Sequence, residues 1–378
     1  MDIQDYRRQL DDINRTMASL FQERMEICGK IARYKQAHHL PVFDSARERE
    51  ILNQVTEMAE PQFSTHTGVL FQSLFDLSRS YQRQCIGTPS ALCRLIDDVT
   101  ANTPKMRPDR AVVACQGVEG AYSQHACDKM FKRPTIVYLS QFEDVFKAVE
   151  RGDCRYGVLP VENSTAGSVN AVYDLMGKYH FYITHSLRLF IPHALLVRPG
   201  TELSEIREVY SHEQALRQCS SFIESLGAKW HICKNTAEAA KLVAQSDRTD
   251  IAAIGSPDCA PLYGLQTAKT GIQNMQNNYT RFICISKTPE IYPGAKKTSI
   301  MLKLGNHPGA LYHMIARFAA LDLNLTKLES RPVAGTDFQF MFYFDVEESV
   351  YSPALKALIA ELEADCEAFT YLGSYTEE

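Results

Sequence analysis

The chain has 378 residues, of which 45% are apolar and 22% charged; this composition is typical of globular domains and excludes a disordered or fibrous protein. Its net charge is −5 and it has no long Lys/Arg run, which argues against nucleic acid or an anionic membrane as the main partner. No apolar stretch reaches the roughly 18–20 residues of a membrane span, and the N-terminus is too polar for a signal peptide, so we expect a cytoplasmic location and no membrane partner.

The eleven cysteines are odd in number, scattered along the chain and never arranged as C-x-x-C. This spacing indicates neither a disulfide framework nor a zinc site. We therefore predict mostly reduced cysteines in the protein core, and no metal.

Residues 2–86 have helical spacing almost throughout, with breaks at Pro41 and Pro61. The spacing predicts one long helix from about Ile3 to Ala37, followed by two shorter ones. The long helix would span roughly 50 Å, too far for the rest of the region to cover its apolar seam. We therefore expect a partner chain on the a/d seam, which comprises Ile3, Tyr6, Leu10, Ile13, Met17, Leu20, Arg24, Ile27, Ile31 and Tyr34.

Arg24 is the charged residue in this seam, where an unpaired cation would be costly, so it needs an anion or an equivalent set of acceptors. Lys35 lies eleven residues on, about 20° round the helix, and shares its face. Arg7 lies about 100° away and could reach a site on an antiparallel partner chain. The next two helices supply further polar residues at Asp44, Arg47, Glu48, Ser78 and Gln82.

Each of these residues also has a structural explanation. Ser45 and Glu48 fit a helix capping box, and a lone seam arginine can set the register of a coiled coil. Lys35 and Arg47 could simply be solvated.

A turn-rich joint at 100–110 precedes a change of pattern. Short β-branched runs then alternate with helices, which predicts an α/β domain on mostly parallel strands. After a second joint at 291–297, the chain predicts a βαββαβ sandwich of the ferredoxin type, with strands at 298–305, 323–330, 338–346 and 369–375.

Polar residues follow several predicted strand ends in the α/β region, where open sheets place their ligands. They are Glu162, Asn163, Ser164, Thr165, Ser211, His212, Thr280 and Arg281; a Gly-rich turn at 117–126 suits an anion. Any one of them could instead be a helix cap or a turn residue.

The helical set Arg7, Arg24, Lys35, Asp44, Arg47, Glu48, Ser78 and Gln82 resembles the active site of the all-helical chorismate mutases, and the whole chain resembles the bifunctional chorismate mutase–prephenate dehydratases. The resemblance implies an intertwined homodimer in which Arg7 completes the partner's site. Arg7 and Arg24 would hold the carboxylates of chorismate, Lys35 and Gln82 the ether oxygen, and Glu48 with Asp44 the ring hydroxyl.

The motifs P-x-E-N, at Pro160 to Asn163, and T-R-F, from Thr280, are similar to those of prephenate dehydratase. This likeness implies two α/β lobes around a cleft, like a periplasmic binding protein. Thr280 would donate a proton to the departing hydroxyl of prephenate, with Arg281 or helix N-termini at a carboxylate; His212 is the alternative proton source.

Two C-terminal motifs resemble those of the ACT domain in phenylalanine-inhibited dehydratases, although a helix start and a strand end would explain them too. They are G-A-L (Gly309, Ala310, Leu311) and E-S-R-P (Glu329, Ser330, Arg331, Pro332), and Tyr312 stands where a smaller aliphatic residue is usual. The likeness implies that phenylalanine binds between paired ACT domains as an allosteric inhibitor.

We thus predict a multi-domain enzyme without cofactors: an all-α mutase domain at 1–90, a dehydratase domain at 108–288 and an α/β ACT domain at 297–376. Two alternatives stay open. The chain could be an amino-acid-sensing binding protein with a helical dimerisation arm, or a dehydratase whose mutase region is inactive.

Overall fold

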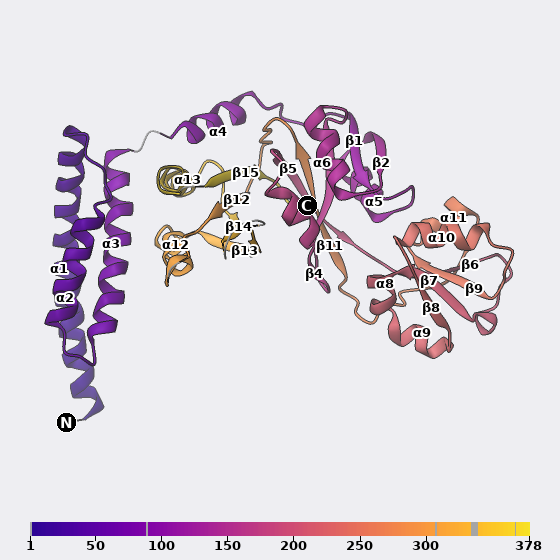
Figure 1. Ribbon diagram of the computed structural model, residues 1–378, viewed down its shortest axis with the longest axis horizontal. Coiled ribbons are helices and arrows are strands. Elements are labelled where there is room, and N and C mark those ends of the chain that lie inside the picture. The colour runs from indigo at the N-terminus through magenta and orange to yellow at the C-terminus, as the bar shows by residue number, and fades with distance from the viewer. Residues whose placement is uncertain (1, 88–89, 307, 334–338, 367) are drawn as a thin grey trace. The chain divides into compact units, whose positions relative to one another are not determined.

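The computed structural model describes residues 2–87, 90–306, 308–333, 339–366 and 368–378 (Figure 1). It divides into two compact units. The first holds Met1–Asp97 with Met301–Thr370, and the second holds Asp98–Ile300 with Tyr371–Glu378. Within the described ranges, no helix has the length and apolar character needed to cross a membrane.

The first unit begins with three long helices that stand side by side in Figure 1: α1 (Ile3–Ala37), α2 (Ser45–Met58) and α3 (Ser64–Ile86). The bounds of α1 are those that the periodicity predicted. Asp44 caps α2 by accepting a hydrogen bond from the backbone N–H of Arg47 at 3.0 Å. Gly87 ends α3 in the left-handed region, with φ 65°. A further helix, α4 (Ala91–Asn102), falls partly in the stretch that we expected to be a turn.

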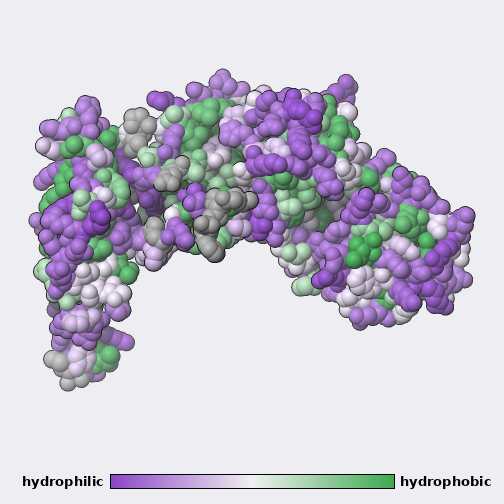
Figure 2. Space-filling model, in the orientation of Figure 1, coloured by the Kyte–Doolittle hydropathy of each residue, from purple (hydrophilic) through white to green (hydrophobic). Residues whose placement is uncertain are grey.

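The inner face of α1 differs from its apolar seam. Cys28, Gly29 and Ala32 are buried, and a Cβ on Gly29 would lie 3.4 Å from the ring of Tyr81 on α3. The apolar seam residues are instead exposed, for example 57% at Leu10. Figure 2 shows hydrophobic patches on the surface of this three-helix region. One chain by itself therefore leaves the predicted seam uncovered.

The C-terminal stretch has the predicted element order βαββαβ. Its elements are β12 (Lys297–Lys303), α12 (Ala310–Ala320), β13 (Asn324–Pro332), β14 (Phe340–Glu347), α13 (Pro353–Asp365) and β15 (Phe369–Tyr375). The strand order is β13-β14-β12-β15. The predicted start of the third strand, Phe338, lies outside the described residues. Within the first unit, α12 contacts α3, and His313 pairs with Asp76 at 2.7 Å.

The second unit contains two sheets. The first has the order β2-β1-β3-β11-β5, with β4 (Gly167–Ser168) paired to β3. Its strands are β1 (Arg110–Gln116), β2 (Arg133–Leu139), β3 (Tyr156–Asn163), β5 (Tyr182–Phe190) and β11 (Tyr279–Ser286), and its helices are α5 (Tyr122–Met130), α6 (Phe142–Arg151) and α7 (Asn170–Met176). Val113, Val158 and Phe282 lie in its buried core.

The second sheet has the order β10-β6-β9-β7-β8. Its strands are β6 (Ala194–Val197), β7 (Glu208–His212), β8 (Lys229–Cys233), β9 (Ile251–Gly255) and β10 (Gln266–Thr270). The helices are α8 (Glu213–Gln218), α9 (Ser220–Leu226), α10 (Thr236–Gln245) and α11 (Cys259–Tyr263), with a 3₁₀ turn, η1, at Leu203–Glu205. Two sheets with separate cores confirm the predicted two-lobed α/β architecture.

The prediction of mostly parallel strands was wrong. The pairs β1–β2, β1–β3, β7–β8 and β7–β9 are parallel, but β11 runs antiparallel to both β3 and β5, and β6 runs antiparallel to β9 and β10. The reason is topological: β11 follows the second sheet in sequence and returns into the first sheet between β3 and β5. All eleven cysteines are free, and most are buried.

Candidate active sites

Arg24 and Ser78 are brought into contact by α1 and α3. A guanidinium nitrogen of Arg24, Nη1, donates to the hydroxyl of Ser78 and, at 3.3 Å, to the carbonyl of Leu74. Ser78 is buried and Arg24 half-buried. Further along, Gln36 donates to the carbonyl of Ile86 at 3.1 Å. Residue numbers rise together along the two helices, so they run in the same direction.

Gln82 and Lys35 lie further along the same two helices. Gln82 is one turn beyond Ser78 on the same face of α3 and is buried, yet its Oε1 has no hydrogen-bond partner in the described part of the chain. An unsatisfied buried amide oxygen is costly, so this position suits a ligand or a donor from elsewhere. The ammonium of Lys35 donates to the carbonyl of Val42 at 2.6 Å.

The remaining helical candidates are held by other partners. Arg47 is exposed and pairs with Glu50 at 2.6 Å. Glu48 accepts a hydrogen bond at 2.6 Å from Arg79, a buried residue that the sequence analysis did not single out. Arg7 is exposed and has no ion pair within the described residues. One chain thus joins Arg24 to Ser78 directly and leaves Arg7 available.

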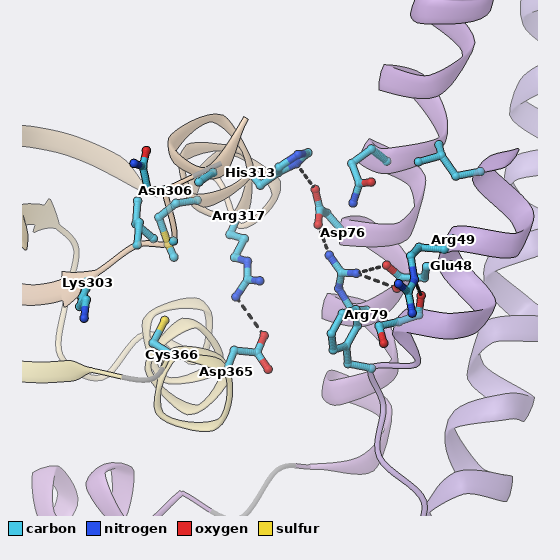
Figure 3. A pocket seen from close by; sticks show the side chains of 18 of the residues that line it. Glu48, Arg49, Asp76, Arg79, Lys303, Asn306, His313, Arg317, Asp365 and Cys366 are labelled. Carbon is cyan, nitrogen blue, oxygen red and sulfur yellow. Dashed lines mark hydrogen bonds and ion pairs between the residues drawn. The ribbon is translucent and has the colours of Figure 1, made fainter. Parts of the chain in front are cut away.

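A cavity of about 630 Å³ in the first unit is lined by residues of the helical and C-terminal regions (Figure 3). Several of its charged side chains pair with one another. Arg79 bridges Glu48 and Asp76, Asp76 also pairs with His313, and Arg317 lies 3.1 Å from Asp365. Of the eight helical candidates only Glu48 lines it. We therefore do not place the mutase chemistry there.

In the second unit, Asn163 and Thr280 face each other on neighbouring strands, β3 and β11. The amide nitrogen of Asn163 donates to Thr280 Oγ1 at 3.0 Å. The orientation of this amide is fixed, because its oxygen accepts hydrogen bonds from the backbone N–H groups of Thr165 (3.1 Å) and Ala166 (3.0 Å). Thr280 Oγ1 therefore already accepts one hydrogen bond, and its own proton remains to be donated.

The network continues through three residues that the sequence analysis missed, Gln218, Asn278 and His193, and Asn163 joins it by donating to the side-chain oxygen of Asn278 at 2.8 Å. The side-chain oxygen of Gln218 accepts from Asn278 at 3.1 Å and lies 2.9 Å from His193 Nε2. Burial lowers the pKa of His193, which therefore favours the neutral ring. Asn278 stands two residues before Thr280 in the T-R-F segment, and that proximity was the signal available in the sequence.

A cavity of about 670 Å³ borders this network. It is lined by Thr165, Ala166, His212, Glu213, Gln214, Arg217, Gln218, Gln273, Asn274, Met275 and Asn278. Arg217 is the one Arg or Lys in this set of described residues. It was not among the predicted residues, although it lies in the last turn of α8, the helix that His212 caps.

The other dehydratase candidates are less closely tied to the cavity. Ser211 is buried and donates to the carbonyl of Ile254 at 2.6 Å. Ser164 donates to the carbonyl of Asn277 at 2.7 Å. Glu162 lies opposite Arg281 in the β3–β11 register.

His212 caps α8: its Nδ1 accepts from the N–H of Gln214 at 3.3 Å. Desolvation lowers the pKa of this ring, and the nearby carboxylate of Glu213 only partly opposes the shift.

Arg281, which we expected at a substrate carboxylate, does not line the cavity. Its buried guanidinium pairs with the carboxylate of Glu377 at 2.7 Å and donates to the hydroxyl of Tyr375 at 2.8 Å.

The C-terminal candidates lie on two contacting elements of the first unit. Gly309, with φ 83°, precedes α12, which begins with Ala310 and Leu311. Glu329, Ser330, Arg331 and Pro332 end β13, which contacts α12. The hydroxyl of Tyr312 is 3.4 Å from Ser73 Oγ on α3.

Within the described residues, no group of three or more His, Cys, Asp or Glu could hold a metal ion.

Comparison with known proteins finds relatives of both the helical and the α/β region. The family model for chorismate mutase type II matches residues 6–83, which take in most of α1 to α3, and the model for prephenate dehydratase matches residues 113–290, which take in most of both sheets. The bifunctional chorismate mutase/prephenate dehydratase of Escherichia coli K12 is 30% identical over 98% of this chain and 95% of its own length. The chain belongs to the bifunctional chorismate mutase/prephenate dehydratase family. It is an enzyme with a mutase region and a dehydratase region.

Two further relatives match the dehydratase side of the chain. Arogenate dehydratase/prephenate dehydratase 2 of Arabidopsis thaliana is 37% identical over 278 residues, which make up 70% of this chain and 73% of that protein. The structure of prephenate dehydratase from Arthrobacter aurescens in complex with L-Phe is 27% identical, with a TM-score of 0.65, over 70% of this chain and 89% of that one.

Proposed function

We propose that α1 to α3, within residues 1–90, convert chorismate to prephenate, and that residues 108–288 convert prephenate to phenylpyruvate in the cytoplasm. We further propose that residues 297–376 form an ACT domain through which phenylalanine inhibits the enzyme. The observation that carries the proposal is that one chain holds both polar constellations at the places where the two family models match. No metal or organic cofactor is needed for either reaction.

The mutase reaction is a pericyclic rearrangement, so the protein contributes shape and charge rather than a base or nucleophile. Arg24 would hold one substrate carboxylate and Arg7 of the partner subunit the other. Lys35 and Gln82 would donate to the ether oxygen as its C–O bond breaks. The buried, incompletely satisfied amide of Gln82 supports this role. Glu48, with Asp44, would accept a hydrogen bond from the ring hydroxyl, and Ser78 and Arg47 would line the substrate.

The exposed seam of α1 supports a homodimer. Leu10, Ile13 and Leu20 are each more than half exposed, and a row of apolar residues of this length is costly to leave in water. A second copy offers the same row. An antiparallel pair of α1 helices would bring Arg7, near one end of the helix, toward the half of the partner helix that carries Arg24.

In the dehydratase reaction the ring carboxylate leaves as carbon dioxide. The electron pair of the broken C–C bond enters the ring, and the ring hydroxyl departs as water once it takes a proton. Thr280 is the proposed donor of that proton, because Asn163 occupies an acceptor position of its oxygen and leaves the O–H free to point at substrate. Thr165 and His212 line the cavity and would contact the substrate, with Glu162 and Ser164 beside them, whereas the buried Ser211 is hydrogen-bonded to Ile254 and would not.

Arg217 is the side chain that we propose for a substrate carboxylate, since it lines the 670 Å³ cavity as a cation. Arg217 is exposed and pairs with the partly exposed Glu213 at 2.7 Å, and a substrate dianion would displace such a surface ion pair at little cost.

A phenylalanine complex of a related prephenate dehydratase supports the proposed regulation. Gly309 to Leu311 at the start of α12 and Glu329 to Pro332 at the end of β13 would line the amino-acid site between paired ACT domains. The hydroxyl of Tyr312 lies near Ser73 on helix α3. A tyrosine at this position, where a smaller aliphatic residue is usual, would therefore affect the packing against α3.

A coupled assay of the full-length chain tests the proposal, with chorismate as substrate and phenylpyruvate as the measured product. Thr280→Ala should convert chorismate but accumulate prephenate, with dehydration slowed by about 10²–10³. Thr270→Ala, an exposed threonine on β10, is the matched control. If neither substrate reacts, the chain is a binding protein; if only prephenate reacts, the mutase region is inactive.

A further inference from the structure

The last residues of the chain continue the first sheet of the second unit. The N–H of Ser186 on β5 donates to the carbonyl of Thr376 at 3.0 Å, and the N–H of Glu378 donates to the carbonyl of Ser186 at 3.0 Å. Residues 376–378 therefore run beside β5, with Ser186 and Glu377 as a parallel bridge. Since β5 is the edge strand of this sheet, the C-terminal tail covers an otherwise open edge.

Glu377 turns its side chain into the protein, where it meets three cations. Its carboxylate lies 2.7 Å from Arg281 Nε, 2.7 Å from Lys297 Nζ and 2.8 Å from Arg188 Nη2, and Ser186 Oγ donates to it at 3.1 Å. The side chains of Arg281 and Lys297 are only 8% and 9% exposed. Burial alone would raise the pKa of Glu377, but these cations outweigh it and the pKa lies below its usual range.

Arg281 connects this carboxylate to the dehydratase site. It directly follows Thr280 on β11, so the two side chains point to opposite faces of the strand. The register of β11 against β3 shifts between Arg281 and Phe282, just after Thr280 pairs with Asn163. Such irregularities re-aim the side chains beside them. A fixed guanidinium at this point therefore fixes where Thr280 stands.

The Glu377–Arg281 ion pair is also connected to the strands that begin and end the C-terminal region. Lys297 opens β12, and the fully buried Tyr375, which closes β15, accepts from Arg281 and lies 2.5 Å from Ser299 Oγ on β12. At one end of the C-terminal region, Lys297 shares the carboxylate of Glu377 with Arg281, and at the other end Tyr375 contacts Arg281 directly. All four residues belong to the second compact unit.

We propose that Glu377 is a positioning residue of the dehydratase: it clamps Arg281 on one face of β11 and thereby holds Thr280 against Asn163 on the other. The inference rests on the proposed function, because it assigns its effect to the proton donor named there. Removal of the carboxylate leaves two buried cations without their common partner, so β11 shifts at the bulge while the cavity that binds substrate is left in place.

Steady-state kinetics of prephenate dehydration by the full-length protein test this role. In Glu377→Gln we expect kcat to fall about 10- to 100-fold, because small displacements of a reacting group have effects of that size, with KM changed less than about twofold. Glu377→Asp, which keeps the charge on a shorter stem, should recover part of the rate. Chorismate turnover by the same samples should be unchanged and reports on folding.

Glu378→Gln is the matched control, since this carboxylate is 53% exposed and lies 2.8 Å from Arg107. An unchanged kcat in Glu377→Gln, a rise in KM alone, or an equal loss in Glu378→Gln would each overturn the proposal. A double-mutant cycle then tests the route: Arg281→Gln/Glu377→Gln should be no slower than Arg281→Gln, whereas independent losses would multiply.

Two outcomes separate this inference from the proposed function. A wild-type chain without dehydratase activity, or a fully active Thr280→Ala, refutes the proposed function itself. If Glu377→Gln does not fold, the double variant Arg281→Gln/Glu377→Gln takes its place, because it removes both charges of the pair. A wild-type kcat in the double variant would overturn the proposed role.

Discussion

At the scale of single residues, Arg24 shows how a charged seam position can serve a ligand. Only its Nη1 is engaged, by Ser78 and Leu74. Within the described ranges, its Nη2 and Nε have no partner. A guanidinium that is held on one side and open on the other presents a ready pair of donors to a carboxylate.

Arg24→Ala should therefore reduce mutase turnover by about 10²–10³, the loss typical of one oriented donor, and leave prephenate dehydration unchanged. Helix α1 should persist, since alanine is a good helix former, and circular dichroism would verify this. Arg15→Ala is the control, because Arg15 lies on the same helix with its side chain 77% exposed. Normal chorismate turnover in Arg24→Ala would contradict the site.

The two proton-donor candidates of the dehydratase differ in their expected pH dependence. Desolvation lowers the pKa of His212 below its usual value, and its Nδ1 accepts a backbone hydrogen bond, so near neutral pH the ring is mostly unprotonated. If His212 were the acid, kcat would fall as the pH rises through that lowered pKa. We expect instead that kcat stays level between about pH 6.5 and 8.

His212→Asn sharpens the comparison, because asparagine also caps a helix and so preserves the start of α8. The variant should keep most of the prephenate dehydratase activity. A decline of wild-type kcat over that pH range, abolished in His212→Asn, would transfer the acid role from Thr280 to His212.

The sequence grouped the candidate residues into motifs, but it could not predict their contacts. The sequence placed Thr280 and Arg281 in one motif, yet the period of a strand sends them to opposite faces, so only Thr280 meets Asn163. Arg217 was missed because an exposed arginine on a helix looks like any solvated cation until the fold places it on a cavity wall.

At the scale of elements, predictability followed the strength of the periodic pattern. The bounds of α1 were predicted because an apolar stripe, broken at Arg24, runs along its 35 residues. Strands β8 and β10 are exposed edge strands of the second sheet, so no alternation of buried and exposed residues marks them in the sequence. The direction of β11 was mispredicted because it depends on which sheet the chain re-enters, and no local pattern encodes that.

The proposed dimer through α1 has a direct test by subunit complementation. Arg7→Ala and Lys35→Ala chains are each expected to lack mutase activity. If Arg7 serves the partner's site, a mixed dimer has one site with both defects and one with neither. After statistical exchange about half of the dimers are mixed, so roughly a quarter of wild-type turnover should return.

The control for this experiment is a mixture of Arg24→Ala and Lys35→Ala chains. Both residues belong to the site of their own chain, so every site in a mixed dimer would keep one defect and no activity should return. Recovery in the control, or none in the Arg7 mixture after verified exchange, would show that Arg7 acts within its own chain.

At the scale of the whole molecule, the order of a helical region, an α/β region and a βαββαβ stretch could be predicted because each region has its own pattern and joints. The close relation of the last strand to the dehydratase could not, since residues 371–378 are far from the rest of their compact unit in sequence. A truncation at residue 296 would therefore remove Lys297, Tyr375 and Glu377 together with the proposed ACT domain. Point variants are the better probe of regulation for this reason.

Phenylalanine binding should be linked to prephenate binding. If phenylalanine favours a dehydratase state with lower substrate affinity, a prephenate analogue must weaken phenylalanine binding by the same factor, typically about 5- to 150-fold. Calorimetry of the full-length chain, with and without the analogue, measures both factors.

Glu329→Ala should weaken phenylalanine binding without a change in uninhibited kcat. Glu347→Ala, at an exposed position on the neighbouring strand β14, should leave phenylalanine binding unchanged. Phenylalanine affinity that the analogue leaves unchanged excludes the linkage; if the analogue abolishes binding and Glu329→Ala does not alter it, phenylalanine competes at the catalytic cavity.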